Sequence, residues 1–237
     1  MAIALVQKTL SQTTTLGVNT ATLVGTAAGN MLVVAITYYG GGSDYFSSIA
    51  GTADSYSQIG PTRSGNATSD YLRLYYAKNI IGGTEAVAVT FSGSPGSGDT
   101  MVAVYEYSGA DTTAPLDSAN PGATGTGTAT SPGAVTPTVN NCLIFSVGVD
   151  DGGANNNTPT ANTGQGFVLQ NHQDDSSSHE RIYTEDVIQT TATSATGSFT
   201  AGGGGWAAQV GVFKPAAAIA STGKKIYMTT NTSFFGS

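Results

Sequence analysis

The residues that could carry acid–base chemistry are three glutamates, Glu106, Glu180 and Glu185, on or beside apolar segments of strand length. Glycoside hydrolysis needs two carboxyl groups facing each other across a cleft, about 5 Å apart in retaining enzymes and about 6.5–9.5 Å apart in inverting ones. The spacing of these glutamates shows no repeat that would bring two together, and no Gly-x-Ser-x-Gly elbow is present. We therefore assign no catalytic residue and predict a protein that is not an enzyme, with a lectin-like glycoside hydrolase as the third alternative.

Metal-binding residues are equally sparse. Asp150 and Asp151, followed by asparagines at 155–157, gather hard oxygen ligands of the kind that calcium prefers. The segment lacks regular ligand spacing and a closing glutamate, so an Asx-rich turn is favoured and the calcium alternative stays open. His172 and His179 match no zinc spacing and are expected to be exposed loop residues. We expect no metal and no cofactor.

Aromatic residues gather around the glycine-rich stretch 40–44. Tyr45, Phe46 and Tyr56 could stack on sugar rings, so they are candidate glycan contacts. The alternative is that these rings pack against the edge of a β-sheet, which suits their amphipathic character. The second candidate function is therefore a carbohydrate-binding module used for host recognition.

The last twenty or so residues have a character of their own. Residues 224–230 have β-propensity and the segment ends near two adjacent phenylalanines. Exposed apolar side chains gain from being covered, and strand addition to a neighbouring subunit is one way to cover them. The predicted docking residues are Ile226, Tyr227, Met228, Phe234 and Phe235. The alternative is that this tail folds back on its own domain.

The elements that must position these residues are short strands with alternating apolar side chains. Residues 31–39 return as 142–149, 71–77 as 181–187, and 101–107 as 206–213, at offsets of roughly 110 residues or slightly less. Helical patterns are nearly absent. The sequence predicts an all-β fold: an antiparallel, jelly-roll-like β-sandwich with a possible internal pseudo-repeat and an extended C-terminal tail.

The domain organisation follows from these offsets. We expect one β-sandwich over 1–214, with similar halves at about 1–110 and 130–214, and a separate tail at 215–237. The Gly- and Thr-rich run 122–132 is expected to be a crossover between the halves. Two small tandem domains remain the alternative.

Composition narrows the function classes. The chain has 237 residues, only 10% of them charged, and a formal net charge of −7. A basic stripe for nucleic acid is missing, so no nucleic-acid partner is expected. The single cysteine, Cys142, lies within a strand pattern and is expected to be a buried apolar residue. No stretch approaches the roughly 18 apolar residues of a membrane span, and residues 1–8 lack the pattern of a signal peptide.

Several strands resemble a β-sandwich domain that recurs in structural proteins of tailed phages and in bacterial surface proteins. The resemblance lies in NMLVVAI at 30–36, LRLYYAKN at 72–79, VAVTFS at 87–92, EYSG at 106–109 and WAAQVGVFK at 206–214. It covers most of 1–214 and supplies no catalytic residue. It implies a non-enzymatic virion protein, namely a capsid decoration, head-fibre or tail subunit. Such a subunit would form a homo-oligomer and would also contact other virion proteins. A virion assembled in the cytoplasm and released by lysis would also need no export signal.

Overall fold

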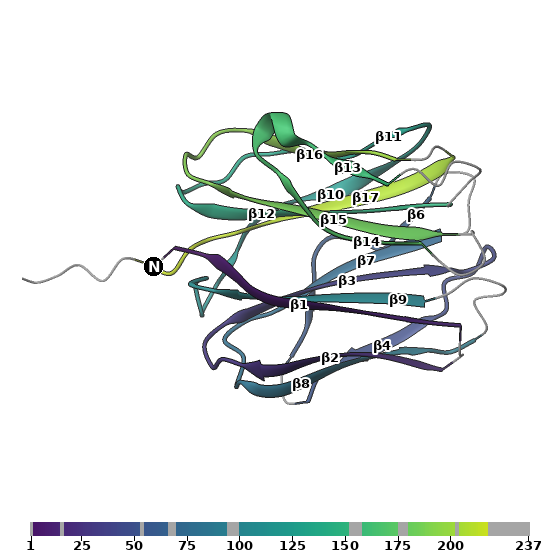
Figure 1. Cartoon of the computed structure of the whole chain (residues 1–237), viewed down its shortest axis with the longest axis horizontal. Coiled ribbons are helices and arrows are strands. Elements are labelled where there is room, and N and C mark those ends of the chain that lie inside the picture. Colours follow the sequence, from purple (N-terminus) through teal and green to yellow (C-terminus); the bar gives the residue numbers. More distant parts are fainter. Residues whose placement is uncertain are drawn as a thin grey trace, which may run out of the picture.

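The structure is a computed structural model that describes residues 2–14, 17–52, 55–65, 70–93, 100–151, 158–174, 180–201 and 204–217 (Figure 1). Within these ranges the chain forms β-strands and one 3₁₀ turn, η1 (Thr163–Gln165), and no α-helix. The strands are β1 (Ala4–Thr13), β2 (Val18–Thr26), β3 (Met31–Tyr39), β4 (Phe46–Ala50), β5 (Ser57–Gln58), β6 (Arg63–Ser64), β7 (Asp70–Ala77), β8 (Gly83–Phe91), β9 (Thr100–Ser108), β10 (Leu116–Thr126), β11 (Ala129–Val135), β12 (Cys142–Asp150), β13 (Thr160–Ala161), β14 (Val168–Asp174), β15 (Arg181–Gln189), β16 (Ala195–Thr200) and β17 (Gly205–Phe213). The predicted all-β class is confirmed.

The strands form four sheets stacked as four layers (Figure 1). The outer sheet of the first half has the order β2-β8-β4, and its inner sheet has the order β1-β9-β3-β7-β5, with β6 also paired to β7. The inner sheet of the second half has the order β10-β17-β12-β15-β14, and its outer sheet has the order β11-β16-β13. Every named strand pair is antiparallel, as predicted for the sandwich.

The two halves repeat one topology. In the inner sheets, the order β1-β9-β3-β7 of the first half corresponds to β10-β17-β12-β15 of the second half. In the outer sheets, β2-β8-β4 corresponds to β11-β16-β13. The inner sheets face each other, and their contacts come in matching pairs: β9 bonds to β15 through side chains, and β7 packs on β17. Such reciprocal contacts are those of a two-fold, isologous interface within a single chain. We call the surface between the inner sheets the seam.

Burial explains why the central strands are so apolar. β3, β9 and β12 lie between other layers, so both of their faces are buried and the hydrophobic run is nearly continuous. The largest apolar cluster spans the seam and includes Tyr105, Phe145 and Phe213, while smaller clusters fill the space between the sheets of each half. Strands of the outer sheets alternate instead, as β2 and β8 do, because one face of each is open.

The run 122–132, expected as a crossover between the halves, lies largely in β10 and β11. β10 pairs with β17 and β11 pairs with β16. Pro121 lies within a register shift of β10, and Pro132 lies within a register shift of β11. Proline is tolerated at such bulges because its missing N–H is not needed there. Each half thus has an outer sheet of its own, and the inner sheets of the two halves share one apolar cluster at the seam.

The polar segment expected to be a loop around His172 is also strand in part. β14 pairs with β15 along the edge of the inner sheet of the second half. Its residues are all partly exposed apart from the exposed Val168, so an edge position accommodates the polar sequence LQNHQD. Helical signal was expected to be nearly absent, and this expectation is confirmed for the part of the chain that the structure describes.

Candidate functional site

The first candidate site is at the end of the molecule where the N-terminus lies (Figure 1). A cavity of about 620 Å³ opens there, and its apolar lining comes from Ala2, Val139, Pro215, Ala216 and Ala217. Asp111, Asn140, Asn141 and Lys214 supply the polar lining. The volume is in the range of about 300–1,000 Å³ that is typical of ligand pockets. We call these nine residues the terminal pole.

Backbone hydrogen bonds hold the terminal pole in shape. Gly109 turns the chain with φ +75°, and a Cβ on it would lie 2.2 Å from the carbonyl oxygen of Ala2, so only glycine fits. The Ala216 N–H donates to the Gly109 carbonyl at 2.8 Å, and the Asp111 N–H donates to the Lys214 carbonyl at 3.0 Å. Residues 214–217 are thereby fixed to the body, although the chain continues beyond them.

Both signs of charge lie close together at this pole. Asp111 accepts hydrogen bonds from the N–H groups of Thr113 and Ala114 at 2.8 and 3.0 Å, and these bonds lower the pKa of its carboxyl. Lys214 and Lys78 are near enough to lower that pKa further, and the Lys78 amine donates to the Thr113 carbonyl. No local sequence pattern indicates this site, because its residues are distant along the chain.

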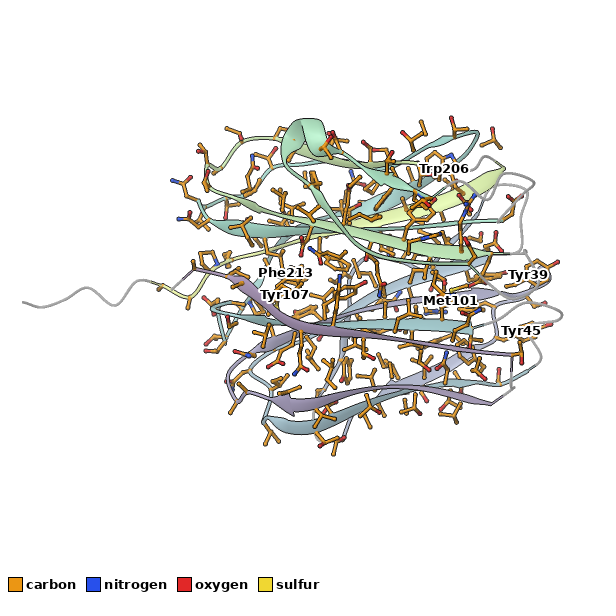
Figure 2. All side chains as sticks on the ribbon, viewed as in Figure 1. Tyr39, Tyr45, Met101, Tyr107, Trp206 and Phe213 are labelled. Carbon is orange, nitrogen blue, oxygen red and sulfur yellow. The ribbon has the colours of Figure 1, made fainter. Side chains whose placement is uncertain are left out.

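The second candidate site is the opposite end, where Tyr39 and Tyr45 lie (Figure 2). Tyr45 is half-buried, and a Cβ on Gly93 would come within 2.6 Å of its ring. Phe46 stacks on Tyr75 with ring centroids 5.8 Å apart, and the Arg73 guanidinium lies 4.1 Å from its centroid. Gly93 thus covers part of the Tyr45 ring, and Phe46 packs against the apolar cluster of the first half. We call this end the aromatic pole.

Tyr56, the third candidate glycan contact, is also engaged internally. Its hydroxyl donates to the Glu85 carboxylate at 2.7 Å, and it packs against the apolar cluster of the first half. The three aromatic candidates therefore do not form one exposed platform. Nearby, Arg73 and Asp44 form an ion pair of 2.5 Å, and the Tyr38 hydroxyl donates to the same Asp44. Burial raises the pKa of Tyr38 strongly, and its hydrogen bond to Asp44 adds to the rise.

The three glutamates considered for glycoside chemistry point into different parts of the interior. Glu106 is buried in the first half and accepts hydrogen bonds from Asn30 at 2.6 Å and Gln7 at 2.6 Å. Glu180 is buried at the seam and accepts one from Thr37 at 2.8 Å. Glu185 points between the sheets of the second half. Each of the three carboxylates is therefore bonded to other groups of the protein interior.

The pKa of the Glu185 carboxyl is strongly raised. It is fully buried, and desolvation is the main reason that its pKa rises to about 7. Its two oxygens accept hydrogen bonds from the N–H of Ser198 at 2.7 Å and of Asn162 at 2.9 Å, which oppose that rise. Both oxygens are thus bonded to backbone rather than directed at a cleft.

The calcium candidate is only partly described. Asp150 forms a buried ion pair of 2.5 Å with Arg181, and Tyr183 donates to it at 3.4 Å. Asp151 accepts a hydrogen bond from the Gly205 N–H at 3.4 Å. The asparagines at 155–157 lie outside the described residues, as does His179. His172 lies on β14 with its ring 3.1 Å from Asp174.

The seam holds a polar cluster that sequence reasoning did not find. Tyr107 donates to Asp186 at 2.6 Å, Gln170 donates to the other oxygen of Asp186 at 2.7 Å, and Tyr105 is bonded to Thr184 at 2.6 Å. Burial raises the pKa of Asp186. The two tyrosine bonds join residues 79 positions apart and tie the two halves together. No local pattern signals them.

Other site predictions receive no direct test. The tail residues Ile226, Tyr227, Met228, Phe234 and Phe235 lie outside the described residues. Among the residues that are described, no three His, Cys, Asp or Glu side chains gather as a metal site would require. The same ranges contain no helix long and apolar enough to span a bilayer. Cys142 is buried, and burial raises the pKa of its thiol.

Comparisons of the chain with protein-family models, with curated proteins and with solved structures found no match. The function is therefore argued from the fold and from the two poles.

Proposed function

We propose that the protein is a non-enzymatic structural subunit of a phage virion, a capsid decoration, head-fibre or tail component that assembles as a homo-oligomer. The observation that carries the proposal is the terminal pole, where Ala2, the root of the C-terminal tail and the 620 Å³ cavity meet at one end of the molecule. A body anchored at that end would present the aromatic pole outward. The resemblance to phage sandwich domains favours the virion over other assemblies.

The outer faces of the two outermost sheets also favour an assembly role. Their outward positions carry small or β-branched residues without charge, such as Thr20, Thr22 and Ala88 on one and Ser131 and Thr196 on the other. Charged residues discourage close association of sheet faces, so their absence leaves both faces open to packing. The two faces lie on opposite sides of the four-layer stack (Figure 1).

Light scattering tests the assembly role. The full chain should have the mass of a defined oligomer, and a truncation after Ala217 should be a folded monomer. This cut retains the Ala216 hydrogen bond and the Ala110–Pro215 bridge, which an earlier cut would remove. A folded truncation with the mass of the full-length oligomer would refute the role of the tail. Mass spectrometry of particles released from cells that carry the gene tests the virion location, and particles without the chain would refute it.

A carbohydrate-binding module remains the second candidate, favoured by the position of Tyr39 and Tyr45 at the aromatic pole (Figure 2). Tyr45→Ala should abolish binding on a glycan array while leaving the fold intact. Tyr56→Phe is the matched control, because it removes the bond to Glu85 and leaves the aromatic pole unchanged. A full chain that binds no glycan on a broad array would refute this candidate.

A further inference from the structure

We propose that the terminal pole is a self-association surface whose cavity receives the aromatic end of the tail, Phe234 and Phe235, from a second copy of the chain. The inference rests on the proposed assembly role and names the surfaces that would meet. The proposed occupant of the cavity is the tail of a second copy. The experiment must distinguish this arrangement from docking of a chain's own tail.

Charge complementarity is the first argument. Residues 1–217 contain six Lys and Arg and all fifteen Asp and Glu, which gives a formal net charge of −9. Residues 218–237 contain Lys224 and Lys225 and no acid, so their charge is +2. A cationic segment is attracted to an anionic body, and this attraction weakens as salt rises.

The lining of the cavity is the second argument. Val139 is 41% exposed although it is a large apolar residue, and it lines the cavity together with alanines and Pro215. An aromatic side chain entering the cavity would cover this surface, and removing apolar surface from water favours association. Asn140 and Asn141 also line the cavity, and their side-chain NH₂ groups can donate to an incoming backbone, although the Asn140 oxygen already accepts from the Ala192 N–H at 2.8 Å.

The arrangement of charge at the terminal pole favours a second copy as the source of the tail. Asp111 and Lys214 line the same cavity, with Lys78 close by. A surface that carries both signs can pair with itself under two-fold symmetry, because each acidic group can then meet a basic group of the other copy. The chain already uses reciprocal packing of this kind at its seam.

The reach of the tail is sufficient. Phe234 is seventeen residues beyond Ala217, which itself lines the cavity. An extended chain spans at most about 3.3–3.6 Å per residue, so these residues reach roughly 55–60 Å. That distance allows each tail of a pole-to-pole pair to enter the cavity of the other copy, and exchange of identical segments is a common route to dimers.

Cysteine pairing between full-length chains tests the proposal. One chain carries Val139→Cys and the other carries Phe235→Cys, and Cys142 is left in place because it is buried. Mild oxidation of the mixture should give a covalent heterodimer, identified by mass spectrometry of the linked peptides. The matched control replaces Val139→Cys by Val18→Cys, since Val18 is 53% exposed and begins β2 at the other end of the molecule. That control should give at least tenfold less heterodimer.

Three outcomes would overturn the proposal. Equal linking by the two cysteine positions would mean random collision, and no linking would mean that the cavity does not receive the tail. A link formed only within the doubly substituted chain Val139→Cys/Phe235→Cys, with none between chains, would mean that the tail occupies its own cavity.

Light scattering separates this proposal from the assembly role. Val139→Arg should weaken self-association at least tenfold, and added salt should weaken it further. Val168→Arg is the matched control and should leave it unchanged, because Val168 is 58% exposed on β14, outside both the cavity and the outer sheets. A full chain that remains a defined oligomer with Val139→Arg would refute the cavity and leave the assembly role standing. A full chain that is a monomer at all concentrations would refute both.

Discussion

The two halves share one strand order and fill their interiors differently. In the first half Tyr38 of β3 lies opposite Tyr71 of β7, and the rings stack with centroids 5.2 Å apart. In the second half Gly148 of β12 lies opposite Tyr183 of β15, and a Cβ on this glycine would come within 2.1 Å of the tyrosine ring. The repeat therefore preserves backbone pairing while side-chain volume is divided differently between partners, as close packing requires.

The ion pairs differ in the same way. Asp44 and Arg73 of the first half have side chains that are 37% and 11% exposed, whereas Asp150 and Arg181 of the second half are 2% and 1% exposed. A partly exposed pair contributes little, because water screens it. Breaking a buried pair leaves a charge without compensation in a medium of low dielectric constant. One topology can therefore hold an ion pair at its edge or in its interior, with different consequences for stability.

Removing one cation from each half tests this difference and has the largest expected effect. Arg181→Met should lower the free energy of unfolding by about 3–5 kcal/mol, because Asp150 stays buried without its cation. Arg73→Met should lower it by about 1–2 kcal/mol, from the partly exposed pair and the contact with Phe46. Urea unfolding followed by circular dichroism measures both. Equal losses would show that burial does not distinguish the two pairs.

The pH dependence of stability tests the second half alone. The pKa of Glu185 is about 7 in the folded state against 4.5 for an ordinary glutamate, so the folded state binds more protons between these values. Stability should therefore fall as pH rises from about 4.5 to 7, by up to about 3 kcal/mol. Asp186, whose pKa is also raised, contributes in the same direction.

Glu185→Gln is the control for this pH effect. It removes the titration but replaces one acceptor by an amide that faces a backbone N–H, so some loss of stability is expected at every pH. The informative quantity is the slope of stability against pH, which should become shallower in the variant. Unchanged slopes between pH 4.5 and 7 would exclude Glu185 as its source.

The seam is the third and smallest test, because there the halves act as one body. Tyr107→Phe removes a hydrogen bond to the Asp186 carboxylate and should cost about 1.5–3 kcal/mol. Tyr105→Phe removes a bond between neutral hydroxyls and should cost about 1 kcal/mol. Thermal unfolding of the two variants ranks them. The reverse order would show that the neutral pair, rather than the charged one, contributes more at the seam.

Much of the fold could be predicted from the sequence. The apolar strands β3, β7, β9, β12, β15 and β17 were recognised with their offsets, because alternation along a strand is a local property. The edge strands β10, β11 and β14 were missed, since Thr, Gly, Asn and Pro are typical of loops as well as of partly exposed edges. With them, each half has an inner and an outer sheet.

The candidate sites depended far more on tertiary structure. Phe46 and Tyr56 are aromatic residues of the kind that can stack on sugars. Only the tertiary structure reveals that Phe46 packs on Tyr75 and that Tyr56 is hydrogen-bonded to Glu85, so that both are engaged internally. The terminal pole joins Ala2, Val139 and Lys214, which are distant in sequence. Composition and alternation by themselves determined the all-β class and indicated a possible repeat, because both follow from side-chain type at neighbouring positions. Which charges are paired, which carboxyls are buried and where a cavity opens were decided by contacts between distant strands, which only the packed sheets bring together.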